Sequence, residues 1–187
     1  LAAVRGVTPP TLVEPLRALV RHEMFELDED ARSAERGQYR FVQGLIREVA
    51  YARLSRADRH LRHRRVAEHF AGLGESELAG IVASHFLAAH ETAPTGTEDL
   101  LTRGRTALLE AARRAASLQA SAQALSLFRQ ALELTPDPES RGWILIDAAE
   151  AASWAGEIEE SLSLAGQAVS VLERSGDPEG ALRAHAG

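Results

Sequence analysis

Residues 124–136 read Ala-Leu-Ser-Leu-Phe-Arg-Gln-Ala-Leu-Glu-Leu-Thr-Pro, and their pattern predicts the architecture of the C-terminal half of the chain. The small side chains of Ala124 and Ala131 fall on one helix face, with the bulky Phe128 between them. Small residues let two paired helices approach closely, and a bulky residue fills the space between adjacent pairs. Pro136 cannot continue a helix, so it ends the unit. The stretch therefore predicts one helix of a hairpin that stacks on further hairpins.

The residues on either side complete this unit and then repeat it. Upstream, the apolar stripe of the partner helix consists of Leu108, Ala111, Ala112 and Ala115. A second copy follows at an offset of 37 residues, measured from Ala124 to Ser161. Its matching positions are Leu145, Ala148, Ala149, Ala152, Ser161, Ala165 and Ala168, with Gly156 in the turn, and a third copy is expected to begin at Pro178. This period predicts stacked helix hairpins.

A short segment of different character precedes the helices. Phe25 and Leu27 alternate with polar residues, and Tyr39 and Phe41 do the same, which is the period of two that is typical of strands. The polar residues 29–37 between the two runs predict an exposed loop. This β-hairpin is the only β-structure that the sequence predicts.

Capping residues and linkers divide the remaining sequence into helices. Thr11, which follows two prolines, and Ser55 are expected to cap the N-termini of two helices. Gly72 is expected to end the second of them. Residues 92–97, which include Pro94, are the strongest linker candidate in the chain.

Composition restricts the possible functions and the compartment. The chain has no cysteine, which excludes disulfides, thiol catalysis and thiolate metal sites and fits the cytoplasm. No apolar run approaches the roughly 20 residues that a membrane span needs. The chain opens on Leu1 and its one methionine is Met24, so we expect further sequence before it. Its last residues begin another helical pattern, so we also expect sequence after it.

All 21 basic residues are arginine, and they are unevenly distributed. Residues 1–75 contain 13 arginines against 11 acids, whereas residues 76–187 contain 8 against 16. The acidic half argues against nucleic-acid binding there. A run of arginines between residues 53 and 65 gives a candidate polar contact surface, represented by Arg59, Arg62 and Arg65. These side chains could contact phosphate, but we favour a solvated face that pairs with acids of a neighbouring domain.

A longer pattern surrounds the second predicted strand. Residues 39–51 read Tyr-Arg-Phe-Val-Gln-Gly-Leu-Ile-Arg-Glu-Val-Ala-Tyr, and the arginine- and histidine-rich helix follows. This order resembles the region after the NTPase core in bacterial signal-transduction ATPases of the STAND class. Examples are large LuxR-type regulators and multidomain proteins similar to adenylate or guanylate cyclases. Gln43 stands where those proteins usually carry a histidine. The repeats over about residues 100–187 resemble tetratricopeptide repeats.

The resemblance implies a mostly α fold in three parts. These are a partial winged-helix unit with one β-hairpin at residues 1–54, a helical connector at 55–95, and a tetratricopeptide-like α-α superhelix at 96–187. The repeat signature residues are Ala112, Ala124, Phe128, Ala131, Pro136, Ala149, Gly156 and Ala168.

The sequence predicts no catalytic, cofactor or metal site in this segment. A GxxxxGK[ST] phosphate loop is absent, and it cannot occur without lysine. We expect structural roles for the histidines, with His85 packed and bonded to a backbone carbonyl. Trp143 and Trp154 share one helix face, where they could line a groove. We expect them instead to pack between repeats.

These observations predict a non-catalytic regulatory and protein–protein interaction segment. The resemblance implies an upstream NTPase domain as one partner and as the place where ATP would bind. A second partner, a protein or an effector, would bind the repeats, and a homo-oligomer is possible. We expect neither nucleic acid nor a membrane as a partner. The alternative is a segment of a DNA-binding transcriptional regulator, in which the arginines of residues 53–65 or the hairpin loop contact DNA.

Overall fold

The computed structural model describes residues 2–30, 32, 36–93 and 95–186, and these residues are mostly helical. The helices are α1 (Ala2–Arg5), α2 (Pro9–Arg21), α3 (Gly44–Ala52), α4 (Arg56–Ala71), α5 (Ala79–Thr92), α6 (Glu98–Ser117), α7 (Ser121–Glu133), α8 (Pro138–Ala155), α9 (Ile158–Ser175) and α10 (Pro178–Ala186). A 3-10 turn, η1, spans Ser76–Leu78, and the strands are β1 (Phe25–Leu27) and β2 (Tyr39–Phe41). The predicted class, mostly α with one β-hairpin, is confirmed.

The two strands pair antiparallel in the way that their alternation predicts. Phe25 lies opposite Phe41, and their rings meet edge to face with centroids 4.5 Å apart. On the other face Arg40 donates to Glu26 at 2.5 Å. These cross-strand pairs fix the register of the hairpin. Residues 31 and 33–35 of the predicted loop lie outside the described residues.

The predicted caps are correct at one helix and wrong at another. The Ser55 hydroxyl accepts from the Asp58 backbone N–H at 3.0 Å, which satisfies one free donor of α4. Thr11 is not a cap, because α2 already begins at Pro9 and Thr8 precedes it. Two prolines suit a first helical turn, where a missing N–H costs nothing. The predicted linker joins α5 to α6, although its Pro94 lies outside the described residues.

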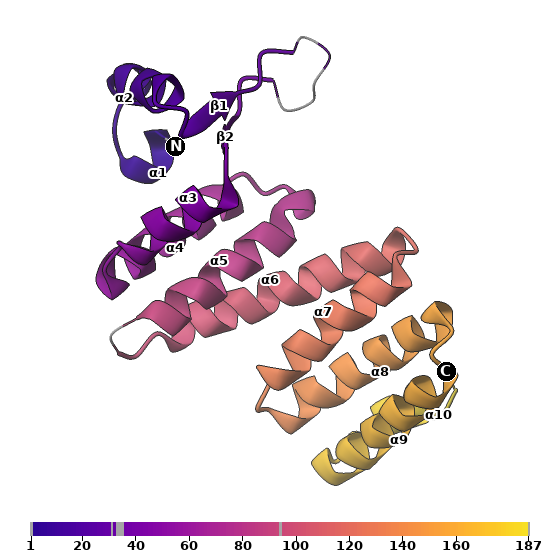
Figure 1. Ribbon diagram of the computed structural model, residues 1–187. Coiled ribbons are helices and arrows are strands. Elements are labelled where there is room, and N and C mark those ends of the chain that lie inside the picture. Colours follow the sequence, from indigo (N-terminus) through magenta and orange to yellow (C-terminus); the bar gives the residue numbers. More distant parts are fainter. Residues whose placement is uncertain (1, 31, 33–35, 94, 187) are drawn as a thin grey trace.

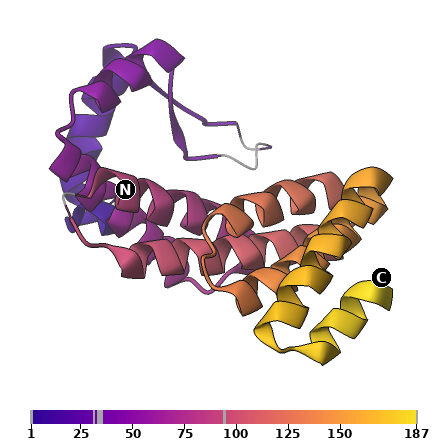
Figure 2. The same ribbon diagram turned by 90° about the horizontal axis from the view of Figure 1, so that it is seen from below.

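Helices α4 to α10 form one array in which each helix packs on the next along the chain (Figures 1 and 2). The N-terminal elements α1, α2 and the hairpin lie at one end of this array, and the C-terminus lies at the other (Figure 1). A single apolar core runs through the array from Ala67 of α4 to Ala184 of α10. The predicted connector and the predicted repeats therefore share one core.

The repeat signature residues occupy equivalent places in the two hairpins α6–α7 and α8–α9. Ala112, Ala124, Ala131 and Ala168 are completely buried, which lets the helices pack closely. Pro136 lies in the connection after α7, which ends at Glu133. The small residues of the motif thus lie in the buried core of the two hairpins.

The turn inside each hairpin also repeats, with a different residue at its centre. Gly156 ends α8 with φ of +83°, and Gln119, one repeat earlier, has φ of +60°. In both turns the next backbone N–H bonds back over the helix end at 2.9 Å, from Ala120 to Ala115 and from Glu157 to Ala152. Both turns therefore need a left-handed residue, which glycine adopts without strain.

Replacing Gln119 with glycine is expected to raise the free energy of unfolding by roughly 0.5–1 kcal/mol. The left-handed conformation costs a side-chain residue about 1–2 kcal/mol, and the greater freedom of glycine in the unfolded chain cancels part of the gain. Urea unfolding followed by circular dichroism measures the change. Gln130→Gly, on the exposed face of α7, is the control and should lose about 1 kcal/mol. Equal losses in both variants would contradict the strain at Gln119.

Candidate functional site

The structure separates the three arginines of the predicted polar surface. All lie on α4, but Arg59 is half-buried, with its guanidinium 4.7 Å from the Tyr51 ring centroid. It also donates to the backbone carbonyl of Ala52 at 3.0 Å. Arg62 and Arg65 are exposed and form no hydrogen bond or ion pair with the described residues. Of the three predicted arginines, Arg62 and Arg65 are therefore available to a partner, whereas Arg59 joins α3 to α4.

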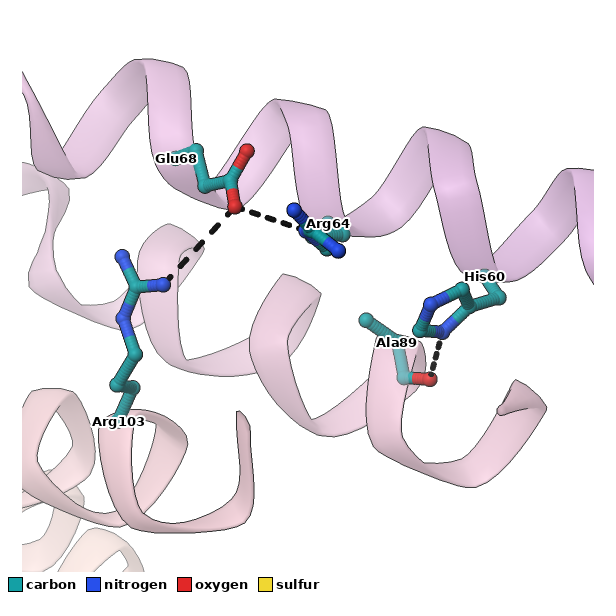
Figure 3. A network of polar contacts seen from close by, with 5 residues as sticks. All are labelled: His60, Arg64, Glu68, Ala89 and Arg103. Atoms are coloured by element: carbon teal, nitrogen blue, oxygen red, sulfur yellow. Dashed lines mark hydrogen bonds and ion pairs between the residues drawn. The ribbon is translucent and has the colours of Figure 1, made fainter. Parts of the chain in front are cut away.

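Other arginines of the run hold the helices of this protein together. Arg64 donates to Glu68 at 2.9 Å, and the same carboxylate oxygen lies 4.0 Å from Arg103 of α6 (Figure 3). Arg56 donates to the backbone carbonyl of Glu91 at the end of α5, at 2.8 Å. Exposed pairs of this kind are individually weak. They show that part of the arginine run is already used between α4, α5 and α6.

His60, His63 and His85 make polar contacts between helices. His60 donates from Nδ1 to the Ala89 carbonyl at 2.8 Å (Figure 3). The predicted backbone partner of His85 is wrong, because its Nδ1 lies 2.8 Å from Nδ1 of His63. Within the described part of the chain, no group of three or more His, Cys, Asp or Glu side chains is placed to hold a metal ion.

One hollow lies on the side of α8 that faces α6, and a second hollow lies toward α10. The first has a volume of about 630 Å³ and includes Arg113, Phe128 and Asp147 in its wall. The second, of about 440 Å³, includes Arg183. Glu150 and Trp154 of α8 line both hollows. We call this surface the α8 groove and define it by Arg113, Asp147, Glu150, Trp154 and Arg183.

The α8 groove carries charges of both signs around an apolar centre. Arg113 lies 3.4 Å from the carboxylate of Asp147, so α6 and α8 form an ion pair across the groove. Partial burial raises the pKa of Asp147, and the nearby Arg113 works against that shift. The guanidinium of Arg183 lies 5.6 Å from the centroid of the Trp143 ring. A ligand would therefore meet fixed acidic and basic groups from three helices.

Trp154 is the most exposed large apolar side chain in this groove, with 76 % of its surface accessible. The predicted packing role is wrong for Trp154 and correct for Trp143, which is half-buried against the core. The walls around Trp154 carry short side chains, among them Ala116, Ser117 and Ser153, which leave its ring uncovered. Helical spacing places both tryptophans on one face but does not show which of them a neighbouring helix covers.

Within the described residues, no helix is both long enough and apolar enough to cross a membrane. Comparisons of the chain with protein-family models, with curated proteins and with solved structures gave no match.

Proposed function

We propose that this chain is a non-catalytic regulatory and protein–protein interaction segment whose α8 groove receives a protein partner. The observation that carries the proposal is the exposure of Trp154 between two hollows. Tryptophan and arginine are the residues most enriched at the energetic centres of protein interfaces. Here Trp154 of α8 and Arg183 of α10 both line the second hollow.

The groove suits a peptide segment with one large apolar side chain and charges on either side of it. The apolar side chain would contact the face of Trp154, while Glu150 and Arg183 would bind groups of opposite charge. Both hollows are open and of moderate size, so an extended chain or a helix could lie along them. The tetratricopeptide-like character of the repeats, expected from the sequence, supports this function.

The regulatory part of the proposal concerns residues 1–54 and rests on the resemblance to STAND-class ATPases. In that view the N-terminal residues belong to a partial winged-helix unit that contacts an NTPase domain of a larger cytoplasmic protein. Leu45 and Val49 on α3 are 66 % and 51 % exposed, and neighbouring apolar surface of this kind is often an interaction site. The repeats would bind the partner, and the N-terminal unit would relay that state.

A second candidate function is DNA binding, which the two exposed and unpaired arginines of α4 favour. Arg62 and Arg65 would then contact phosphates, and affinity would fall steeply with salt. The double variant Arg62→Gln/Arg65→Gln separates the two functions. It should leave peptide binding in the α8 groove unchanged, and it should abolish any salt-sensitive binding to duplex DNA.

Replacing Trp154 with alanine is expected to weaken peptide binding at least tenfold, which corresponds to about 1.4 kcal/mol. Peptides would be selected on the wild-type chain from a library of short random sequences, and their affinities would be measured by calorimetry. Leu162→Ala is the matched control, because Leu162 is 70 % exposed on α9 and lies outside both hollows. The proposal fails if the selected peptides bind the Trp154 variant as tightly as the wild type.

A further inference from the structure

A chain of polar side chains joins α3 to α4 and α5. The Tyr51 hydroxyl at the end of α3 lies 2.8 Å from Nε2 of His63 on α4. The other ring nitrogen of His63, Nδ1, lies 2.8 Å from Nδ1 of His85 on α5. The rings of Tyr51 and His63 meet edge to face with centroids 5.8 Å apart, and the two histidine rings are tilted by 38° with centroids 5.1 Å apart. Three consecutive helices are thus linked by one line of hydrogen bonds.

This line is a large part of what holds α3 in place. None of the side chains of α3, all of which the structure describes, is fully buried. Leu45 and Val49 are mostly exposed, so apolar packing contributes little to its position. Besides the contact with His63, α3 meets α4 where Arg59 lies over the Tyr51 ring and donates to the Ala52 carbonyl. The attachment of α3 to the array is therefore mainly polar.

We propose that Tyr51, His63 and His85 form a proton-sensitive latch, which holds α3 on α4 at neutral pH and releases it in mildly acidic solution. The reason is the number of protons that the line can hold. A hydrogen bond between two Nδ1 atoms needs one N–H donor and one free lone pair. When both histidines are neutral, the Tyr51 hydroxyl donates to Nε2 of His63. The proton of the His63 ring is then on Nδ1, which donates to Nδ1 of His85.

A first added proton can be accommodated, but a second cannot. If one proton is added, the His85 Nδ1–H donates to His63, whose Nε2–H then donates to the Tyr51 oxygen. If both rings are protonated, two N–H groups and two positive charges face each other at 2.8 Å, so the hydrogen bond between His63 and His85 is lost. The repelled His63 ring then leaves the position in which its Nε2 meets the Tyr51 hydroxyl, and α3 loses that contact. In the released state the two rings no longer face each other, so each can take up a proton. Acid therefore favours the released state.

The elements packed around the two histidines carry further charged groups. Glu91 of α5 favours the proton on His63, but this is weaker than the opposing effect of burial. On α4, Arg59 is a fixed positive charge beside Tyr51, and His60 is occupied by the Ala89 carbonyl. Other elements that pack on α4 or α5 also carry charged groups. Arg5 of α1 is exposed, and Glu77 of η1 pairs with Arg114. Arg103 of α6 lies over the Phe86 ring.

The sign of the pH dependence follows from these surroundings. Burial lowers the pKa of His63, and burial together with the charge of His63 lowers the pKa of His85. The docked state therefore holds fewer protons than the released state below pH 6.5, the ordinary pKa of histidine. Docking of α3 is strongest above that pH, and it weakens as the pH falls toward the lowered values.

Hydrogen exchange of the α3 amides in the full chain tests the latch. Each exchange rate is divided by the intrinsic rate at the same pH. Two histidines that protonate on release should lower the protection of residues 44–52 at least tenfold between about pH 7.5 and about pH 5.5. In His63→Gln and His85→Gln, where the substituted position cannot take up a proton, this decrease should shrink or vanish.

His90→Gln is the matched control, because His90 also lies on α5 but contacts Thr97. It should keep the full pH dependence. Peptides from α8 report in the same experiment whether each variant is folded. Unchanged protection of α3 across the pH range in the wild type would overturn the latch. A pH dependence that persists undiminished in both folded glutamine variants would also overturn it.

Discussion

Replacing Phe128 with alanine is expected to lower the free energy of unfolding by about 3–5 kcal/mol. Phe128 is 2 % exposed and lies in the core that connects α6, α7 and α8. Its neighbours one turn away on the buried face of α7 are Ala124, Leu125, Ala131 and Leu132. The two alanines are too short to fill the space that the ring would leave. The cavity would therefore remain open, and its full cost would appear in the measurement.

Urea unfolding monitored by circular dichroism measures this loss. Phe128→Leu keeps most of the apolar volume and should lose clearly less than the alanine variant. Leu118→Ala removes a side chain that is 65 % exposed and should change stability by no more than about 0.5 kcal/mol. A loss below about 1 kcal/mol in Phe128→Ala would show that the ring does not fill the junction between the hairpins.

The second repeat has no equivalent of this aromatic ring. Ala165 occupies the corresponding place on α9 and is half-buried, and the nearby wall of the α8 groove is hollow. The two copies of the motif therefore differ in how their junctions are filled. The first copy fills its junction with Phe128, whereas the second leaves an open surface on which Trp154 is exposed.

Periodicity was sufficient to predict most of the helices and the hairpin. The alternation at Phe25, Leu27, Tyr39 and Phe41 indicates which side chains share a face of the hairpin, whereas the pairing of Phe25 with Phe41 and of Leu27 with Tyr39 comes from the structure. The start of a helix at Pro178 was equally predictable, because proline suits a first helical turn. Local sequence determines such features, so no tertiary information was needed.

The features that the sequence did not reveal depend on contacts between distant residues. The partner of His85 lies 22 residues away on another helix, so no spacing on α5 could indicate it. The exposure of Trp154 depends on short side chains of the neighbouring helices. Arg59, Arg62 and Arg65 have the same chemistry in the sequence. Only the position of α3 beside Arg59 distinguishes it from the other two.

Gly142 gives a prediction in which the close approach of two helices can be measured. A Cβ atom on Gly142 of α8 would lie 2.5 Å from both Cγ and Cδ2 of Leu172 on α9. Leu172 is completely buried, so its side chain has little room to move aside. Gly142→Ala is therefore expected to lower the free energy of unfolding by about 1–3 kcal/mol, although alanine favours the helix itself.

Gly166→Ala on α9 is the matched control. A Cβ there meets nothing within 4 Å, so only helix propensity acts, and stability should rise by up to about 1 kcal/mol. The same exchange of glycine for alanine is thus expected to have opposite signs on two adjacent helices. A gain of stability in both variants would mean that α8 and α9 separate easily at this contact.

A double-mutant cycle with Leu172→Ala identifies the cause of the loss at Gly142. In the wild type, Leu172→Ala creates a cavity and should cost about 2–5 kcal/mol. In the Gly142→Ala background the same change also removes the clash, and the new methyl group fills part of the cavity. Leu172→Ala should therefore cost at least about 1 kcal/mol less in that background. If the stability losses of the two single variants simply add in the double variant, the loss in Gly142→Ala arises within α8 alone. Coupling of the expected sign would show that the absence of a side chain at Gly142 sets the distance between α8 and α9.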